Sequence, residues 1–412
     1  MTYSDIGERF IRYASVFTQS EEGFDTTPST AVQRDLAKIL YEELKEMGAE
    51  DVFYDEEHCY VYASVPATAE HAPVIGLMAH MDTSNAVRAE RVKPHRVDHY
   101  DGGDIPLDES GKRVLSPRDY PVMKNVLGDD LVVTDGTSVL GADDKAGVSA
   151  IMEVFSRLLK EPERRHGKVV LCFTPDEEVG NGVLNIDTER FKCDHAYTID
   201  GGALGETSYE SFNAAGAKII INGISAHPGY AKGIMLNALK VAIELNSLLP
   251  EDEVPEKTDG RQGYYHLIHM FGSADTAGME YLIRDHDRQK FEDRKRVLEA
   301  AVNKINDKYG PNTAELDISD TYYNMAEKLR DRPEIVTDAM DAMRELSIEP
   351  VIEPIRGGTD GCQLTFMGIP CPNLGTGGYN FHSRYEFASV DEMKQNVELI
   401  LLILERAASE DR

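Results

Sequence analysis

Cysteine is scarce in this 412-residue chain, with five residues scattered along it and no C-x-x-C pair. An odd number of isolated cysteines argues against a disulfide framework and against cysteine metal ligands. Basic residues are also few, because 43 Lys and Arg face 73 Asp and Glu and leave a net charge of −30. This deficit excludes the basic patches that binding to nucleic acid or to an anionic membrane requires.

Long hydrophobic runs are missing as well. The longest, Leu399 to Leu404, is far too short to span a bilayer. The N-terminal residues up to Phe17 mix charges with apolar side chains, which is typical of an amphipathic helix and not of a signal peptide. We therefore expect a soluble, cytoplasmic protein with reduced thiols, and the length predicts about two domains.

One stretch organises the rest of the chain. The apolar run 168–173 predicts a buried parallel strand, and Asp176-Glu177-Glu178 follows directly at its carboxyl end. Functional residues of α/β sheets collect at such ends. Adjacent side chains on an extended segment point in opposite directions, so the two glutamates suggest two jobs, metal binding and proton transfer. An isolated acidic triplet is more often a solvated turn, so other motifs have to decide.

Three further segments carry polar residues where a predicted strand ends or a helix begins. His80 and Asp82 end the strand 73–79 and lie two apart, hence on one face, as a metal-bound histidine and its orienting carboxylate would. Asp143 opens a predicted helix that runs to about residue 160, and Asp200 ends the strand 195–199. Together with Glu178 these residues form the ligand set of a divalent metal site.

His382 completes a set of two histidines and three carboxylates. If Asp143 bridges two metals, each metal receives one imidazole, one private carboxylate and the shared one. A water completes the pair and is acidified by it, and Glu177 could take the proton of that water and return it to a leaving amine. The chemistry inferred is hydrolysis of an amide.

The pattern changes after Thr207. Strands are expected at 217–224, 264–272, 279–287 and 314–321, with helices at 235–249 and 289–309. This order, βαββαβ, predicts a ferredoxin-like module of four strands backed by two helices. We expect the fold to be α/β, with a first domain formed by residues 1–207 and 322–412 and a second domain, 208–321, inserted into it.

Several motifs resemble those of the co-catalytic di-zinc peptidases related to glutamate carboxypeptidase and aminoacylase. They are His80-Met81-Asp82-Thr83, Gly141 to Gly147, Asp176 to Gly180, Asp200-Gly201-Gly202, Ser225 to Pro228, Arg356 to Gly361 and the His382 segment. Tyr100 to Ile105 and the long excursion 91–131 are similar to the tripeptide-aminopeptidase branch of that clan. The resemblance spans nearly the whole chain.

The resemblance implies a mixed-sheet α/β/α zinc-peptidase catalytic domain with a ferredoxin-like lid, and two Zn²⁺ per chain for which Co²⁺ or Mn²⁺ can substitute. His80 and Asp200 would hold one zinc, Glu178 and His382 the other, and Asp143 would bridge them. Asp82 would orient His80, Glu177 would be the general base, and the peptide bond between Asp143 and Asp144 would be cis.

For the lid, the resemblance implies that His227 stabilises the oxyanion and that Arg356 clamps a substrate carboxylate. Asn237 and the loop 375–378, including Gly377, would contact polar groups of the substrate, and a homodimer through the lid is an open expectation. Simpler alternatives are a turn cap for His227, a surface ion pair of Arg356 with Glu353, and an exposed or supporting carboxylate for Glu386.

The predicted function is that of an aminopeptidase which releases the N-terminal residue of small peptides, specifically tripeptides. A dipeptidase, a carboxypeptidase or an N-acyl amino acid deacylase of the same clan is the alternative among enzymes. A peptide-binding relative without turnover is the alternative of another class, and the intact Glu177 weighs against it because pure binding needs no base.

Overall fold

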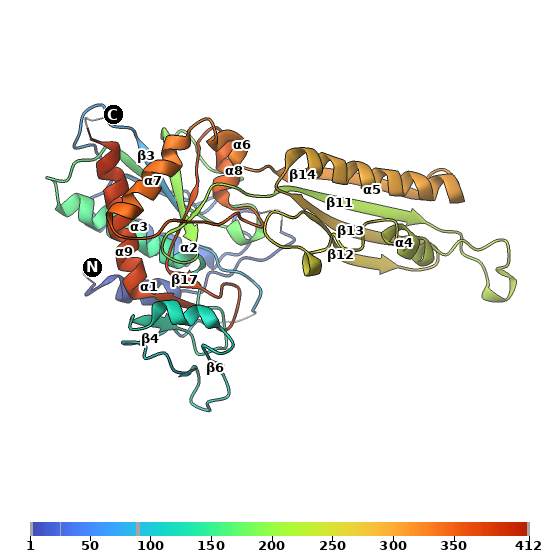
Figure 1. The fold of residues 1–412 in the computed structure, drawn as a ribbon, viewed down its shortest axis with the longest axis horizontal. Coiled ribbons are helices and arrows are strands. Elements are labelled where there is room, and N and C mark those ends of the chain that lie inside the picture. The colour runs from blue at the N-terminus through green and yellow to red at the C-terminus, as the bar shows by residue number, and fades with distance from the viewer. Residues whose placement is uncertain (1–2, 25, 88–90, 410–412) are drawn as a thin grey trace. The chain divides into compact units, whose positions relative to one another are not determined.

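The computed structural model describes residues 3–24, 26–87 and 91–409. The chain forms two compact units, a discontinuous unit of Met1–Tyr209, Lys328–Glu353 and Thr359–Arg412, and an inserted unit of Glu210–Glu327 and Pro354–Gly358 (Figure 1). The inserted unit is thus longer than the segment 208–321 expected from the sequence. Its extra residues belong there because Ile355 forms a parallel bridge to Ser211, whose amide donates to the side chain of Asn324.

A mixed eight-stranded sheet forms the centre of the discontinuous unit. Its strand order is β1-β2-β8-β3-β9-β16-β10-β15. The strands are β1 (Glu50–Tyr54), β2 (Val61–Val65), β3 (Ile75–His80), β8 (Val169–Thr174), β9 (His195–Gly201), β10 (Glu206–Ser208), β15 (Val351–Ile352) and β16 (Asn373–Gly375). β8, β3, β9 and β16 run parallel, so their carboxyl ends meet at one edge of the sheet. The expected mixed sheet is confirmed.

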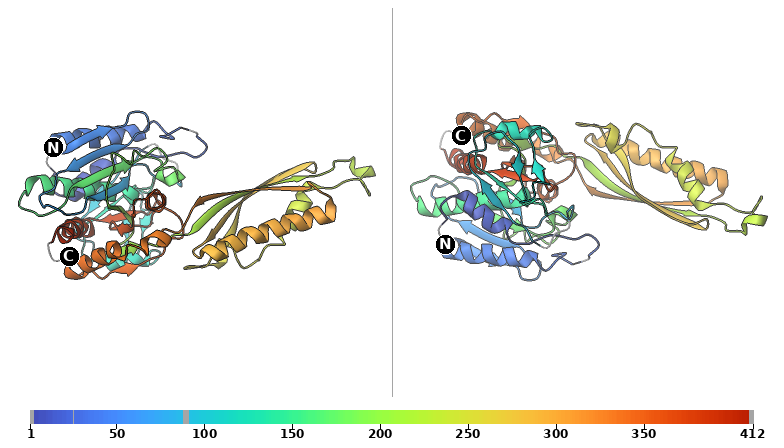
Figure 2. Two further views of the ribbon diagram at one scale, coloured as in Figure 1. Left: turned by 90° about the horizontal axis from the view of Figure 1, so that it is seen from above. Right: turned by 90° about the horizontal axis from the view of Figure 1, so that it is seen from below.

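Helices pack on this sheet and on one another. α3 lies against β3 and β9, α2 against β1 and β2, and α9 against α1, α3 and α7 (Figure 2). The helices are α1 (Ile6–Ala14), α2 (Gln33–Met47), α3 (Ala142–Lys160), α6 (Ala326–Leu329), α7 (Pro333–Glu345), α8 (Asp360–Phe366) and α9 (Val390–Ala407). α2 ends at Gly48, which adopts φ 84° in the left-handed region, as is common for a glycine at the end of a helix.

α2 begins without a side-chain cap. Its N-cap residue is Val32, although Ser29 and Thr30 just before it are of the residue types that usually cap helices. Ser29 is used elsewhere, because its main-chain N–H and its hydroxyl both donate to the carboxylate of Asp176, at 2.7 and 2.6 Å. A partner distant in sequence therefore overrides the local capping preference.

The segment 91–131 is not the mere surface excursion that its composition suggests. It contains β4 (His95–Val97), β5 (Ile105–Pro106), β6 (Val114–Leu115), the 3-10 helix η1 (Pro121–Val126) and the start of β7 (Leu131–Val133). β7 and β4 join β17 (Gly378–Tyr379) and β18 (Phe387–Ser389) in a small sheet of order β17-β18-β7-β4. Tyr100, Leu115, Met123 and Phe387 are buried together there, so the segment has a core of its own.

The inserted unit has the predicted βαββαβ order. Its elements are β11 (Asn213–Asn222), α4 (Ala238–Asn246), β12 (Tyr264–Gly272), β13 (Thr276–Asp285), α5 (Arg288–Tyr309) and β14 (Ala314–Tyr322), with 3-10 turns η3 (Pro228–Tyr230) and η4 (Pro255–Lys257). The antiparallel sheet has the order β12-β13-β11-β14. Both helices pack on it over a separate apolar core that includes Ile219, Ile283 and Leu298. The ferredoxin-like prediction is confirmed.

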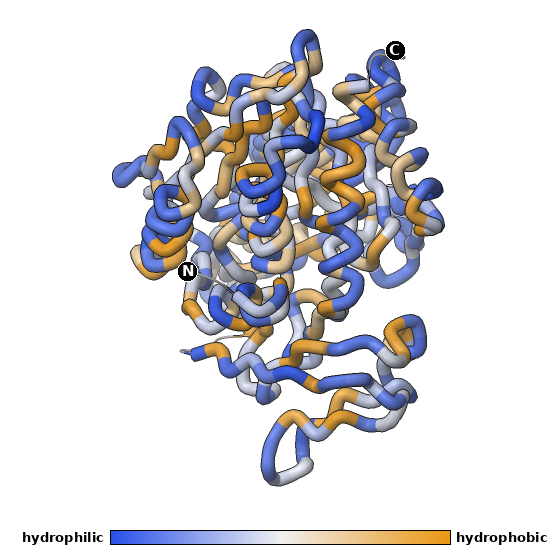
Figure 3. Tube along the Cα trace, turned by 90° about the vertical axis from the view of Figure 1, so that its left-hand side faces the viewer, coloured by the Kyte–Doolittle hydropathy of each residue, from blue (hydrophilic) through white to orange (hydrophobic). Residues whose placement is uncertain are grey.

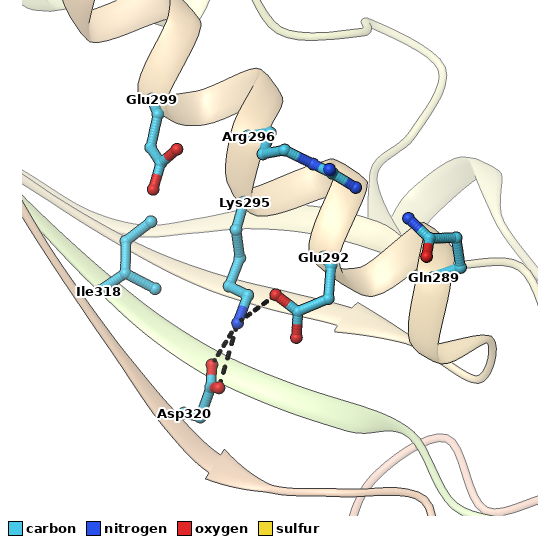
Figure 4. Close-up of a pocket in the computed structure, with 7 residues that line it drawn as sticks. All are labelled: Gln289, Glu292, Lys295, Arg296, Glu299, Ile318 and Asp320. Carbon is cyan, nitrogen blue, oxygen red and sulfur yellow. Dashed lines mark hydrogen bonds and ion pairs between the residues drawn. The ribbon is translucent and has the colours of Figure 1, made fainter.

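A charged groove lies between α5 and β14 of the inserted unit (Figure 4). Lys295 is placed between Glu292 and Asp320, 2.9 Å from an oxygen of each, and Arg296 pairs with Asp293. Both basic side chains of the groove therefore have acidic partners. With their charges already paired, these side chains offer no free charge for a ligand, and we assign the groove no function.

Hydrophilic and hydrophobic stretches alternate along the helices of the discontinuous unit (Figure 3), as expected for helices that bury one face. All five cysteines are free thiols. In the described part of the chain, every helix is too short or too polar to cross a membrane.

Candidate metal centre

The edge where the parallel strands end carries the predicted site residues. His80 is the last residue of β3 and pairs in register with Thr174, the last residue of β8. The acidic triplet is not extended, as the sequence suggested, because Asp176 adopts φ 55° and residues Glu177–Val179 form the 3-10 turn η2. The two glutamates therefore diverge because of a tight turn and not because of strand alternation.

One group of ligand atoms gathers around His80. Its Nε2 lies 2.8 Å from Oδ1 of Asp143 and 3.7 Å from Oδ1 of Asp200. These three residues each offer one atom within 4.8 Å of the other two, a spacing that suits a common metal ion.

A second group forms around His382. Its Nε2 lies 2.9 Å from Oε2 of Glu178 and 3.1 Å from Oδ2 of Asp143. Asp143 thus presents one carboxylate oxygen to each histidine. The structure brings all five predicted ligands together, in two groups that share Asp143.

Asp82 connects His80 to the acidic turn. The Nδ1 atom of His80 lies 3.1 Å from the carbonyl oxygen of Asp82 and 3.3 Å from its Oδ1. The same carboxylate accepts hydrogen bonds from the main-chain N–H groups of Glu177 and Glu178, at 3.0 and 3.2 Å. With Nδ1 directed at Asp82, the Nε2 atom of His80 faces the other carboxylates, which is the arrangement of an oriented metal ligand.

The electrostatics of the site reflect crowded carboxylates. Burial raises the pKa of Asp200 well above its usual range, and Asp144 adds to the effect. Burial likewise raises the pKa of Glu177 well above its usual range, with a further contribution from Asp200. Hydrogen bonds to Asp143 and Glu178 raise the pKa of His382 to about 10. Burial disfavours the charged form of Asp143, but its bonds from His382 and His80 outweigh burial and lower its pKa.

These residues fit a pair of divalent cations. Each group combines one imidazole nitrogen with two carboxylate oxygens, a donor set that zinc accepts. In addition, Oε1 of Glu178 is buried without a hydrogen-bond partner among the described residues. An unpaired buried carboxylate oxygen is costly, and a cation at the second group would satisfy it.

The peptide bond between Asp143 and Asp144 is cis, as the resemblance implied. Asp144 is turned away from the ligand groups and towards the main chain. Its carboxylate accepts from the N–H groups of His80, at 3.3 Å, and Gly147, at 3.1 Å. It therefore ties the start of α3 to the end of β3.

Of the two alternatives for Glu386, the exposed carboxylate is wrong and the supporting carboxylate agrees with the structure. Glu386 is 1% exposed and accepts three hydrogen bonds from the main chain between Leu140 and Asp143. Its position four residues after His382 was the only available signal, and spacing alone cannot show which backbone it contacts.

Two of the predicted substrate residues lie in the inserted unit next to helical starts. The exposed His227 caps η3, where its Nδ1 accepts a hydrogen bond from the N–H of Gly229 at 3.1 Å. In the neutral ring this leaves Nε2 as the protonated nitrogen, a hydrogen-bond donor. Asn237 is the N-cap of α4 and accepts from the N–H of Lys240.

Arg356 is held within the inserted unit. Its guanidinium donates to the carbonyl oxygens of Gly260, Gln262 and Thr258, at 2.7, 3.2 and 3.3 Å, and to the Thr258 hydroxyl. It also lies over the ring of Phe212. The alternative of a surface ion pair with Glu353 is therefore wrong, and a substrate carboxylate at Arg356 would have to replace some of these bonds.

Gly377 lies in the discontinuous unit with φ 87°. Its N–H donates to the carbonyl of Gly202, and its own carbonyl accepts from the N–H of Ser389, both at 2.9 Å. These bonds fix the loop 375–378 against the turn that follows Asp200, so the predicted substrate contact of Gly377 has to compete with them.

The sequence matches peptidase family M20/M25/M40 over residues 140–406. The chain belongs to this family and is an enzyme that acts on peptide bonds. Peptidase T of Bacillus licheniformis is 49% identical over 405 residues, which cover 97% of this chain and 98% of that protein.

Two solved structures share the fold. The aminopeptidase PepT from Bacillus cereus and a tripeptidase from Staphylococcus aureus each superpose with a TM-score of 0.77, at 23% identity over 98% of both chains. A discontinuous unit that contains an inserted ferredoxin-like unit is thus the shared architecture.

Proposed function

We propose that this enzyme is a di-zinc aminopeptidase that hydrolyses the N-terminal peptide bond of tripeptides. The observation that carries the proposal is the pair of ligand groups that share Asp143, with Glu177 beside them. The name Peptidase T of a relative 49% identical along almost the whole chain supports the substrate class.

The five ligands His80, Asp143, Glu178, Asp200 and His382 would hold the two ions, and Asp143 belongs to both ligand groups. Zinc, for which cobalt or manganese can substitute, supplies Lewis acidity that polarises the scissile carbonyl and favours attack by water. Asp82 keeps the ring of His80 in its orientation through Nδ1.

Glu177 moves the proton. It is the acidic neighbour of Glu178 that belongs to neither ligand group, and burial followed by the charge of Asp200 raises its pKa. A carboxylate with a raised pKa accepts a proton from the attacking water more readily than an ordinary glutamate does, and it can then give that proton to the leaving amine.

The remaining site residues bind the substrate in this proposal. The Nε2–H of His227 donates to the oxygen of the scissile carbonyl as negative charge develops there. Arg356 receives the C-terminal carboxylate in exchange for bonds to the loop 258–262, since a guanidinium binds a carboxylate with two parallel hydrogen bonds. Asn237 and the loop around Gly377 contribute contacts to peptide groups.

Blocking the ends of the substrate distinguishes this proposal from its alternatives. An aminopeptidase loses turnover when the α-amine of a tripeptide is acetylated, whereas an N-acyl amino acid deacylase gains a substrate. A carboxypeptidase is distinguished by its products, because it releases the C-terminal residue of the tripeptide and not the N-terminal one. Retained cleavage of the acetylated peptide would contradict the proposal.

Assembly and location complete the proposal. We place the enzyme in the cytoplasm, where its five free thiols stay reduced.

A homodimer through the inserted unit stays a prediction, and β12 and β14 are the sheet edges through which such pairing would occur. Size-exclusion chromatography with light scattering tests the homodimer, which should have twice the molar mass of the 45.8 kDa chain.

A further inference from the structure

The carboxylate of Glu386 holds the stretch of main chain that leads to Asp143. Oε2 of Glu386 accepts from the N–H groups of Leu140 at 2.6 Å and Gly141 at 2.9 Å, and Oε1 accepts from the N–H of Asp143 at 3.1 Å. Both carboxylate oxygens are thus used on a segment of four residues.

This segment has few other means of keeping its shape. It precedes the regular part of α3, where the first N–H groups of a helix lack partners within the helix. Gly141 adopts φ 78°, and Asp143 and Asp144 have non-helical backbone angles. Leu140 and Gly141 are buried, so without Glu386 their N–H groups would be left away from water without a hydrogen-bond partner, which is unfavourable.

The position of Asp143 matters for both ligand groups at once. Its Oδ1 lies 2.8 Å from Nε2 of His80 and its Oδ2 lies 3.1 Å from Nε2 of His382. A shift of the Asp143 main chain therefore displaces both oxygens. Glu386 and His382 are four residues apart, so one short loop supplies a ligand of the second group and the carboxylate that fixes the shared ligand.

We propose that Glu386 is a positioning residue of the metal centre, which fixes the main chain of Asp143 before any ion binds so that its carboxylate can serve both groups. The inference rests on the proposed di-metal function and goes beyond it. Glu386 itself binds neither metal nor substrate in this account, because its oxygens are engaged by main-chain N–H groups.

The variant Glu386→Gln tests this role. A glutamine offers one acceptor oxygen in place of two, and its NH₂ group would face at least one of the three N–H donors. Metal-free protein is titrated with Co²⁺, and the absorption bands of bound cobalt report both affinity and ligand geometry. We expect Co²⁺ binding to weaken about 10- to 100-fold and the cobalt spectrum to change.

Glu43→Gln is the matched control. Glu43 is also buried, at 4% exposed, and its carboxylate accepts from Arg9 and Tyr13 on α1, away from the ligand groups. Its replacement is expected to lower the melting temperature without changing the Co²⁺ spectrum, and to leave the affinity within about threefold. If Glu386 is merely structural, Glu386→Gln should behave like this control, with a lower melting temperature but an unchanged Co²⁺ spectrum and affinity. That result would overturn the inference.

Two further outcomes are separable. If the wild-type protein binds no Co²⁺, the proposed metal centre itself is wrong, and the role of Glu386 falls with it. If Glu386→Gln does not fold, hydrogen exchange on the metal-free wild-type protein tests instead whether the main chain before Asp143 is held in place without a metal. Protected amides at Leu140, Gly141 and Asp143 are expected because the Glu386 bonds do not need a metal, and rapid exchange there would contradict preorganisation.

Discussion

Glu177 and Glu178 are neighbours in the chain with different surroundings. Glu178 is bonded to His382 through Oε2, and its Oε1 is buried without a partner in the described part of the chain. Glu177 belongs to neither ligand group, although its N–H is fixed by Asp82. The two carboxylates are therefore suited to different tasks, metal binding and proton transfer.

Replacing Glu177 with Gln should separate these tasks. We expect kcat to fall about 10²- to 10⁴-fold because the proton acceptor is lost, while the chain still binds two equivalents of zinc. Glu178→Gln is the control and should lose zinc as well as activity. Elemental analysis measures the zinc content of each variant, and steady-state kinetics measures its kcat. A fully active Glu177→Gln enzyme would refute the role of Glu177 as the proton acceptor.

His227 can be tested against its simpler role as a turn cap. His227→Ala removes both the acceptor for Gly229 and the Nε2 donor, whereas His227→Asp retains an acceptor for Gly229 and has no donor. If the donor stabilises the oxyanion, both variants should lose about 10²- to 10³-fold in kcat with unchanged zinc content. Normal turnover of His227→Asp would show that His227 serves only as a cap.

At the scale of elements, the site depends on how closely α3 approaches the sheet. A Cβ atom added at Gly147 of α3 would lie 1.9 Å from the carbonyl oxygen of Ile199 on β9. That residue precedes Asp200, and Asp143 opens α3, so this contact sets the separation of two ligands.

Gly147→Ala should therefore force the helix away from β9. We expect a loss of at least about 1–3 kcal/mol in the free energy of unfolding, together with weaker zinc binding. Gly216→Ala on β11 is the control, because no heavy atom lies within 4 Å of its added Cβ, and it should stay within about 0.5 kcal/mol of wild type. Urea unfolding compares the two, and equal stabilities would contradict the packing argument.

The sequence predicts those elements whose signals are local. The apolar runs predict β3, β8 and β9, and the ferredoxin-like order of the inserted unit is predicted from its alternating strand and helix patterns. The ligand types are likewise visible, because His80, Asp143, Glu178 and Asp200 stand at strand ends or helix starts.

What the sequence does not show depends on distant partners. Ser29 is drawn to Asp176 and does not cap α2, and Arg356 bonds to a loop about a hundred residues earlier instead of to Glu353. The role of Glu386 is hidden for the same reason, since its partners are three N–H groups. Main-chain N–H groups are present at nearly every residue, so they leave no signal in side-chain patterns.

At the scale of the whole molecule, acid stability depends in part on a histidine buried without charge. Burial lowers the pKa of His166; Gly167 and Glu405 act in the opposite direction and Arg164 in the same one, and the net shift is downward. Its Nε2 is buried with no partner among the described residues. The folded state therefore takes up this proton less readily than the unfolded state does.

The stability that His166 contributes should be complete above the unfolded histidine pKa of about 6.5 and should decline as the pH falls below it. His166→Gln removes the titrating group and should flatten the pH dependence of the unfolding free energy between about pH 7.5 and 5.5. Urea unfolding of metal-free wild type and variant provides the comparison. Parallel profiles would show that His166 does not contribute.

The central claim, a metal-dependent aminopeptidase for tripeptides, is tested most directly by mass spectrometry. One unblocked tripeptide X-Y-Z is incubated with zinc-loaded enzyme and, in parallel, with chelated enzyme. We predict free X and the dipeptide Y-Z, formed only in the presence of zinc. The dipeptide X-Y with free Z, or no cleavage of the tripeptide by the zinc-loaded enzyme, would contradict the account.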